Sequence, residues 1–224
     1  MKIAVIIPMD SEYRQMQQLL GGDTGMLAGN EIVLCRCGIG KVNAALGAQQ
    51  LISEHHPDCI INPGVAGGID CSLKIMDVVV AKECVYHDVW CGEPNAKGQV
   101  QGMPARFAAN ECLYSLAMTV SEPIHGGLLC TGDQFITNEE ALKEIKAAFP
   151  EGLAVDMESC AIAQTCHINE VPFLALRIIS DIPSEAKTTE DHKVQYDNFW
   201  ATLADNSFLH IRKVLEAMPT SLCD

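Results

Sequence analysis

Two acidic clusters bound an otherwise apolar stretch, residues 154–181, and they are the first candidates for chemistry in this chain. Asp156-Met157-Glu158 lies near the start of the stretch and Ser180-Asp181 lies at its end. Burying a lone ionised carboxylate costs several kcal/mol, so such a group needs a partner or shifts toward its protonated form. We therefore expect chemistry where these carboxylates lie.

The elements that would position these groups alternate between strands and helices. The stretch 154–181 is predicted to form a helix, a turn and a strand buried on both faces, because a continuous apolar run bounded by turn signals is typical of such a strand. In open α/β sheets the ligand crevice lies at the carboxyl ends of the strands, where Asp181 would lie. The other predicted strands are 2–8, 31–37, 58–62, 77–80, 83–87 and 126–131, and the other predicted helices are 12–20, 42–54, 108–120, 138–148 and 194–218.

Several predicted strands are followed by residues that could have either a structural or a functional role. Glu12 comes directly after the first strand, where it either complements the dipole of the next helix or takes part in chemistry. The glycine-containing turn 64–68 either admits a ligand close to the backbone or is structural. Phe135 is either a stacking platform for a flat ligand or core filler. The turn 38–41, Gly-Ile-Gly-Lys, weakly resembles a phosphate-binding loop, but it lacks the spacing of the known motifs.

Composition excludes several classes of protein. The chain has 224 residues, enough for the core of one domain over 1–224, and its 48% hydrophobic content is ordinary for a globular protein. A formal net charge of −14 argues against nucleic-acid and anionic-membrane partners. The eleven cysteines are odd in number, include no CxxC pair and follow no secretory signal. We therefore expect reduced thiols in the cytoplasm, no metal site and no membrane span.

Seven short motifs follow one another over essentially the whole chain. They are Met9-x-x-Glu12, Gly38-Ile39-Gly40-Lys41-Val42, Asn62-x-Gly64-Val65-Ala66-Gly67-Gly68, Tyr86-His87-Asp88, Gly132-Asp133-x-Phe135-Ile136, Val155-Asp156-Met157-Glu158 and Arg177-Ile178-Ile179-Ser180-Asp181. In this order they resemble the nucleoside phosphorylase superfamily, specifically the bacterial 5′-methylthioadenosine/S-adenosylhomocysteine nucleosidases. The resemblance implies a three-layer α/β/α sandwich around a twisted, mixed central sheet. It also implies a homodimer, which the apolar helix 42–54 favours as well, and a place in methionine salvage.

The family hydrolyses the N-ribosidic bond between adenine and ribose through an oxocarbenium-like transition state, without a cofactor. The resemblance implies that Asp181 is the general acid that protonates N7 of adenine, and that Glu12 positions and deprotonates the attacking water. Asp181 must then hold a proton at neutral pH, which a dry pocket favours. Attack opposite the leaving group needs room between acid and base, ~6.5–9.5 Å by analogy with inverting glycosidases.

The resemblance also implies the substrate contacts. Glu158 and the Met157 backbone would hold the ribose hydroxyls, with Arg177 orienting Glu158 and the water. The implied adenine contacts are Phe135 by stacking, the Ile136 backbone at the base edge, Ser180 as support for the Asp181 loop, and Ala66 and Gly67 as pocket lining. The residues implied beside the 5′-alkylthio group are Met9, Ile39 and Tyr196.

Three features depart from the family pattern. Val65 stands where some relatives carry Ser, so a side-chain hydrogen bond is absent there, and Asp156 stands where Glu often precedes the Met-Glu pair. The segment 89–106 aligns poorly, and in relatives a partner subunit's version of this loop helps to close the 5′ end of the site. The preference among 5′ substituents therefore stays open.

Alternative functions also stay open at this point. A purine nucleoside phosphorylase would need a cationic cradle for phosphate. The pair Ile61-Asn62 ahead of the glycines offers no arginine and favours water, whereas Arg14 and Arg36 keep phosphate possible. Another purine nucleoside, futalosine-like or plain adenosine, is a second alternative. A non-catalytic nucleoside-binding protein is a third, which the presence of both Glu12 and Asp181 disfavours.

Overall fold

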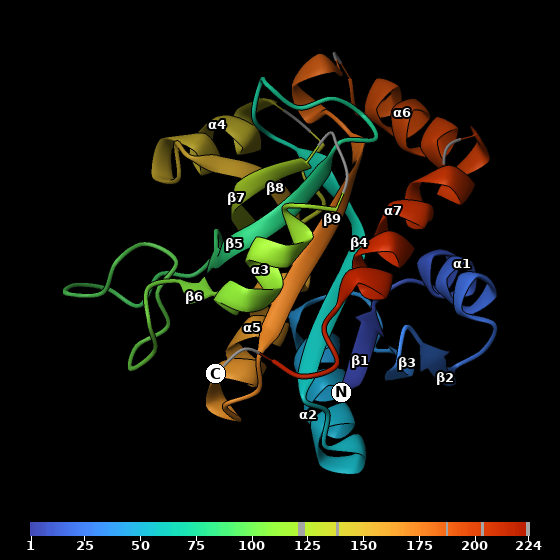
Figure 1. Ribbon diagram of the computed structural model, residues 1–224. Coiled ribbons are helices and arrows are strands. Elements are labelled where there is room, and N and C mark those ends of the chain that lie inside the picture. Colours follow the sequence, from blue (N-terminus) through green and yellow to red (C-terminus); the bar gives the residue numbers. More distant parts are fainter. Residues whose placement is uncertain (121–123, 138, 187, 203, 223–224) are drawn as a thin grey trace.

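The computed structural model describes residues 1–120, 124–137, 139–186, 188–202 and 204–222 (Figure 1). Within these residues nine strands form one sheet, with the order β2-β3-β1-β4-β8-β7-β5-β6 and with β9 pairing both β4 and β5. The strands are β1 (Lys2–Ile7), β2 (Thr24–Leu27), β3 (Asn30–Arg36), β4 (Cys59–Gly68), β5 (Val78–Tyr86), β6 (Phe107–Ala108), β7 (Ile124–Thr131), β8 (Gly152–Asp156) and β9 (Phe173–Asp181).

The sheet is mixed, as predicted. Strand β1 runs parallel to β3 and β4, and β4 runs parallel to β9. Strand β5 runs parallel to β7 but antiparallel to β9. Every residue of β9 is buried, because this strand lies between β4 and β5 in the middle of the sheet and is covered on both faces. The prediction of a strand buried on both faces after residue 172 is therefore confirmed.

Helices cover both faces of the sheet, which confirms the three-layer α/β/α architecture (Figure 1). On one face α2 and α5 pack with the sheet into one apolar cluster. On the other face residues of α1, α3 and α7 form a second cluster with β1, β4 and β9. The helical segments are α1 (Asp10–Leu20), α2 (Lys41–His55), α3 (Glu111–Ala117), α4 (Glu139–Ala148), α5 (Ser159–Ile168), the 3-10 turn η1 (Pro183–Glu185), α6 (Thr189–Thr202) and α7 (Ala204–Ala217).

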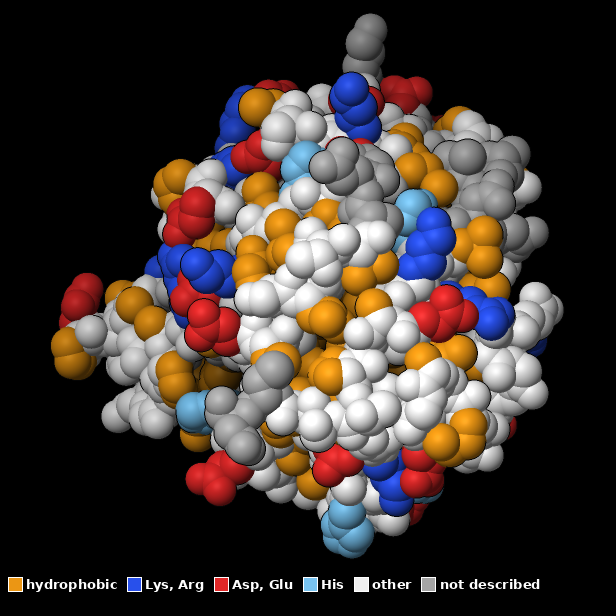
Figure 2. Space-filling view, in the orientation of Figure 1, with side chains coloured by type: hydrophobic (Ala, Val, Ile, Leu, Met, Phe, Trp, Pro, Cys, Tyr) orange, Lys and Arg blue, Asp and Glu red, His pale blue; other side chains and the backbone are white. Residues whose placement is uncertain are grey.

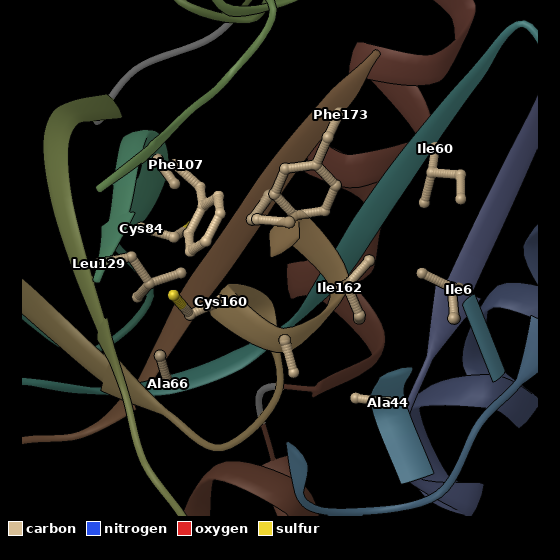
Figure 3. Packing of buried hydrophobic residues seen from close by; sticks show 14 of the residues in the cluster. Ile6, Ala44, Ile60, Ala66, Cys84, Phe107, Leu129, Cys160, Ile162 and Phe173 are labelled. Atoms are coloured by element: carbon tan, nitrogen blue, oxygen red, sulfur yellow. The ribbon is translucent and has the colours of Figure 1, made fainter. Parts of the chain in front are cut away.

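Helix α5 lies at the centre of the first cluster. Cys160 and Ile162 on α5 are completely buried, and Figure 3 shows them among residues of the sheet such as Leu129 and Ile60. The helix is rich in small residues, so its backbone can approach the sheet closely. This close packing places the start of α5, where Glu158 lies, against the ends of neighbouring strands.

Strand β4 is longer than predicted, and the prediction of a turn at 64–68 was wrong. Its residues pair with β9 from Ile60 opposite Phe173 to Gly67 opposite Asp181, with a register shift between Ala66 and Gly67. Pairing with a central strand outweighs the turn preference of glycine. The glycines instead allow neighbouring side chains to approach the strand closely, a common role of glycine within strands.

Other boundaries also differ from the prediction. The segments predicted as two strands, 77–80 and 83–87, form the single strand β5, with an irregular register near residue 82. Strands β2, β6 and β8 were missed, and residues 154–156 belong to β8 rather than to a helix. The predicted helix 108–120 is shorter in the structure, where α3 spans Glu111–Ala117. The predicted helix 194–218 corresponds to α6 and α7, and α6 begins earlier, at Thr189. Residue 138, the predicted start of α4, lies outside the described residues.

The surface shows no broad basic area on the face drawn in Figure 2, where acidic and basic side chains are interspersed among apolar ones over the described residues. None of the described helices is long and apolar enough to cross a membrane.

Candidate active site

A cavity of about 300 Å³ opens where several strands end. All the predicted site residues except Arg177 line this cavity. Its lining is Pro8, Met9, Glu12, Ile39, Val65, Ala66, Gly67, Gln134, Phe135, Ile136, Val155, Asp156, Met157, Glu158, Ser180, Asp181 and Tyr196. Segments that are far apart in the sequence thus converge on one site, because the sheet brings the ends of β1, β4, β7, β8 and β9 together.

Glu12 lies in the first turn of α1 and is 1% exposed. Its Oε2 accepts a hydrogen bond from the Met9 backbone N–H at 3.2 Å, in a capping box, and its Oε1 accepts one from the Val65 N–H at 2.8 Å. Burial raises the pKa of Glu12 to about 7, although Arg177 and both backbone donors act in the opposite direction. A carboxylate with this pKa suits a general base near neutral pH.

Strand β4 must carry a glycine where it passes Glu12. A Cβ on Gly64 would lie 2.9 Å from Glu12 Oε1 and 3.0 Å from Arg177 Nη1. Any side chain there would displace the carboxylate, the guanidinium or the strand. The glycine-containing segment therefore allows close approach of the chain's own side chains to its backbone, whereas the sequence had suggested either close approach of a ligand or a structural turn.

Arg177 is 1% exposed and lies behind the cavity. Its Nε donates to Asp156 Oδ2 at 2.9 Å, and its Nη2 donates to Asn62 Oδ1 at 2.6 Å and to Ser159 Oγ at 2.7 Å. Its Nη1 also donates to the backbone carbonyls of Asn62 and Leu176. None of these hydrogen bonds is to Glu158, which the resemblance implied that Arg177 would orient. Burial alone would lower the pKa of Arg177, but the charges of Asp156, Glu12 and Glu158 outweigh that effect and raise it.

Sequence reasoning did not find this buried network. Asp156 accepts from Thr131 Oγ1 at 2.5 Å and from the Ser159 N–H at 3.1 Å, in addition to its ion pair with Arg177. Asn62 completes the network, and its amide donates to the Ile6 carbonyl at 2.8 Å. The available signal was the presence of Asn62 and Asp156 in apolar surroundings, since buried polar groups need partners.

Glu158 joins two helices at the cavity. It is the residue before α5, and its Oε1 accepts from the backbone N–H of Gly40, at the start of α2, at 2.8 Å. Burial, and then the neighbouring charge of Asp156, holds the pKa of Glu158 well above its usual range. When this carboxyl group is protonated, its proton would be available for a hydrogen bond with a sugar hydroxyl.

The turn 38–41 binds carboxylates of the chain itself. Besides the contact between Gly40 and Glu158, the Lys41 N–H donates to Asp133 Oδ1 at 2.8 Å, and Lys41 Nζ pairs with Asp88 at 2.7 Å. The backbone donors that suggested a weak resemblance to a phosphate loop are therefore occupied by protein groups. These contacts hold the start of α2, the loop after β5 and the loop after β7 together.

Asp181 ends β9 and is 2% exposed. The Ser180 hydroxyl donates to its Oδ1 at 2.5 Å. His192 was not predicted, and its Nε2 lies 2.5 Å from Asp181 Oδ2. The sequence placed His192 in a polar loop ahead of the last helix, where no pattern distinguished it from other surface residues.

The two buried carboxyl groups, Glu12 and Asp181, contact the same strand. Glu12 accepts from the Val65 N–H, and a Cβ on Gly67 would lie 3.1 Å from Asp181 Oδ2. Residues two apart on a strand are about 7 Å apart, so the two carboxyl groups approach β4 at separate points.

Apolar and aromatic residues form the remaining walls. Phe135 is 56% exposed, and its ring centroid lies 5.7 Å from that of Tyr196. The Tyr196 hydroxyl donates to Met9 Sδ at 3.4 Å. Ile39, which is 50% exposed, also lines the cavity. The structure thus gathers the three residues predicted beside the 5′ group and leaves the Phe135 ring accessible.

No cluster of three or more His, Cys, Asp or Glu residues that could hold a metal ion occurs in the described part of the chain.

Comparisons with known proteins agree with this geometry. The family model of the phosphorylase superfamily matches residues 22–216. The 5′-methylthioadenosine/S-adenosylhomocysteine nucleosidase of Bacillus cereus (strain G9842) is 39% identical over 235 residues, which cover 97% of this chain and 100% of that protein.

Solved structures of similar proteins have the same fold. The nucleosidase of this type from Neisseria meningitidis, in complex with methylthio-immucillin-A, superposes with a TM-score of 0.88 at 36% identity and covers 97% of this chain and 99% of its own. The Streptococcus pneumoniae MTA/SAH nucleosidase in complex with 8-aminoadenine superposes with a TM-score of 0.89 at 32% identity and covers 97% of this chain and 100% of its own.

Proposed function

Because the chain belongs to the phosphorylase superfamily and, within it, to the 5′-methylthioadenosine/S-adenosylhomocysteine nucleosidases, we propose that its cavity hydrolyses the N-ribosidic bond of these two nucleosides. The products are adenine and the 5′-substituted ribose. The observation that carries the proposal is the pair of buried carboxyl groups, Glu12 and Asp181, which line one apolar cavity and contact β4 two residues apart.

Glu12 acts as the base. The bond between N9 of adenine and C1′ breaks, water adds to C1′, and Glu12 takes a proton from the water. The pKa of about 7 leaves Glu12 partly ionised at neutral pH and makes it a stronger base than an exposed glutamate. Its two backbone hydrogen bonds fix the direction of the carboxylate.

Asp181 acts as the acid. The electron pair of the breaking bond passes to the purine, and N7 receives the proton of Asp181, so that adenine leaves as a neutral molecule. Asp181 is almost completely buried and lines the cavity. Ser180 supports the carboxyl group through its contact with Oδ1.

The walls of the cavity hold the rest of the substrate. We assign the ribose hydroxyls to Glu158 and the Met157 backbone, with Arg177 acting through Asp156 and through its charge near Glu12. Phe135, Ile136, Ala66 and Gly67 receive the adenine, and Met9, Ile39 and Tyr196 receive the 5′-alkylthio group. The apolar character of the last three residues suits a thioether better than a phosphate or a free hydroxyl.

Water is favoured over phosphate as the nucleophile. The cavity lining, as far as the structure describes it, contains no lysine or arginine. Arg36 pairs with Asp10 at the surface, Arg14 is exposed, and Arg177 is already occupied by buried partners. Phosphate binding needs a cationic cradle, so a phosphorylase would require a rearrangement of these groups.

We also propose a cytoplasmic homodimer that serves methionine salvage. Val42 and Leu46 on α2 are 70% and 66% exposed, and Ile39 lies at the same end of this helix and lines the cavity. A partner that covers these residues would also close the 5′ end of the site. None of the ten cysteines that the structure describes forms a disulfide bond, which supports a reducing compartment.

The deciding experiment measures adenine release from methylthioadenosine, S-adenosylhomocysteine and adenosine, with and without phosphate. We expect release without phosphate, free 5′-substituted ribose as the second product, and a preference for the two thioether substrates. Release that requires phosphate and yields ribose 1-phosphate would make the protein a phosphorylase. Binding without release would leave a nucleoside-binding protein.

A further inference from the structure

Helix α6 turns one face toward the active site. His192, Gln195 and Tyr196 occupy positions i, i+3 and i+4, which share one side of a helix. Gln195 Oε1 accepts from the Ile182 N–H at 3.1 Å, and the Tyr196 hydroxyl contacts Met9 Sδ at 3.4 Å. This face of α6 therefore contacts both the end of β9, next to the acid, and the end of β1, next to the base.

His192 is the residue of this face that reaches the acid. It is 0% exposed and is absent from the described lining of the cavity, so it contacts Asp181 from behind. Its Nδ1 is buried and has no hydrogen-bond partner among the described residues. A proton on Nδ1 would be a buried donor without an acceptor, which is unfavourable. The neutral ring therefore carries its proton on Nε2 and donates it to Asp181 Oδ2.

We propose that His192 is a positioning residue for the acid: its Nε2–H holds Oδ2 of Asp181, so that the transferable proton occupies Oδ1, the oxygen that Ser180 contacts. The inference rests on the proposed function. In the reaction the Oδ1–H bond breaks, the N7–H bond forms, and the electron pair of the N9–C1′ bond passes to the purine. His192 keeps its own proton throughout.

A purely structural role for His192 would have a different consequence. Its ring lies 5.1 Å from the ring of Phe135, at an angle of 59°. If His192 only supported Phe135, its loss would weaken binding of the adenine and raise KM. A positioning role toward Asp181 instead lowers kcat, because proton transfer depends on the direction of the carboxyl group.

The test compares two amides at position 192. His192→Gln places an N–H donor near the position of Nε2, whereas the side chain of His192→Asn is too short to reach Asp181. We expect His192→Asn to lower kcat about 100-fold with little change in KM, and His192→Gln to stay within about fivefold of the original kcat. Val194→Ala, on the exposed side of α6, is the matched control and should leave both constants unchanged.

A second measurement shows whether His192 acts through proton transfer. In a 5-methylthioriboside of 4-nitrophenol the leaving group departs as a stable anion and needs no proton. His192→Asn should therefore hydrolyse this compound within about fivefold of the original rate. In the Asp181→Asn background, His192→Asn should cause no further loss.

The outcomes separate the two proposals. An unchanged kcat in His192→Asn, or an equal loss on the nitrophenol compound, would overturn the role of His192. A further loss in the Asp181→Asn background would also overturn it, since the two residues would then act independently. An active Asp181→Asn enzyme would instead overturn the acid role of Asp181, which belongs to the proposed function.

Discussion

The two ends of the cavity hold their carboxyl groups in different ways. At the end proposed to hold the base, here called the base end, Glu12 accepts hydrogen bonds from the backbone N–H groups of Met9 and Val65. At the end proposed to hold the acid, here called the acid end, Asp181 is held by the side chains of Ser180 and His192. Backbone donors are placed by α1 and β4 as soon as these elements form. Side-chain donors depend on rotamers and, for His192, on the position of α6.

This difference indicates that the hydrogen-bond donors at the base end are fixed by the backbone, whereas those at the acid end can change with side-chain rotamers. The base end also rests on the buried network around Arg177, which packs against Gly64 beside Glu12. The acid end lies against a helix that follows the last strand. Changes at the base end should therefore affect stability as well as rate, and changes at the acid end should affect mainly rate.

The largest expected effect is at the acid end. Asp181→Asn keeps the shape of the side chain but cannot deliver a proton, so kcat should fall about 10³–10⁴-fold. Adenine release measures this loss. The free energy of unfolding and the affinity for adenine should change little, and a variant that turned over normally would show that another group protonates the base.

The next effect is on stability at the base end. Arg177→Met removes the partner of a buried carboxylate, Asp156, and should lower the free energy of unfolding by about 3–5 kcal/mol. Arg36→Met, which removes an exposed ion pair with Asp10, is the control and should cost less than about 1 kcal/mol. Urea unfolding of both variants checks the difference, and equal losses would show that the buried network does not stabilise this end.

A third prediction concerns stability and pH at the base end. The pKa of Glu12 is about 7 in the folded protein and has an ordinary value of 4.5, so the folded state binds this proton more tightly than the unfolded state. The stabilisation from this group is complete below pH 4.5 and is lost as the pH rises through 7. Relative to Glu12→Gln, the original protein should lose about 3 kcal/mol over this range.

Urea unfolding of the two proteins from pH 5 to 8 measures this change. The hydrogen bond that Gln loses to a backbone N–H contributes equally at each pH. The test is therefore how the difference in the free energy of unfolding between the two proteins changes with pH. A difference that stayed constant with pH would mean that Glu12 is not protonated preferentially in the folded state.

A smaller effect should appear in the pH dependence of the rate. Glu12 must be ionised to accept a proton from water, so kcat should fall about tenfold per pH unit below about pH 7. A profile from pH 5 to 9 on methylthioadenosine provides the measurement. The residual activity of Glu12→Gln should not show this fall in rate below about pH 7. If the fall persisted in that variant, another group would be responsible for it.

The smallest expected effect on the kinetic constants is at Phe135, which lines the cavity and is largely exposed. Phe135→Leu keeps an apolar side chain but removes the flat ring, so KM should rise up to about tenfold with kcat nearly unchanged, as expected for a stacking contact of about 1 kcal/mol. Initial rates over a range of substrate concentrations separate the two constants. A loss confined to kcat would instead place Phe135 among the residues that align the acid.

The sequence indicated residues that gather at the ends of the strands but not the order of the strands in the sheet, for a physical reason that Glu12 illustrates. The position of Glu12 directly after β1 can be recognised from neighbouring residues in the sequence, and the capping box at the start of α1 is a short-range interaction. Asp181 is likewise recognisable as the end of an apolar strand. The residues that line the cavity were identified by motif, and the structure brings them together because the ends of the strands converge.

Long-range features were not predictable in this way. The segment 64–68 has the composition of a turn, and only its pairing with β9 makes it a strand. Arg177 reaches Asp156 and Asn62 rather than Glu158 because three different strands pack side by side. His192 lies eleven residues after Asp181 in a polar segment, and its contact depends on how α6 packs, which no local pattern encodes.

Strand β4 has one further consequence for the site. Its Val65 N–H donates to Glu12, and its Gly67 pairs with Asp181 within the sheet. Helix α6 forms no part of that sheet and reaches Asp181 through His192. A shift of α6 would therefore change the contact of His192 with Asp181 but would leave the contacts of both carboxyl groups with β4 in place.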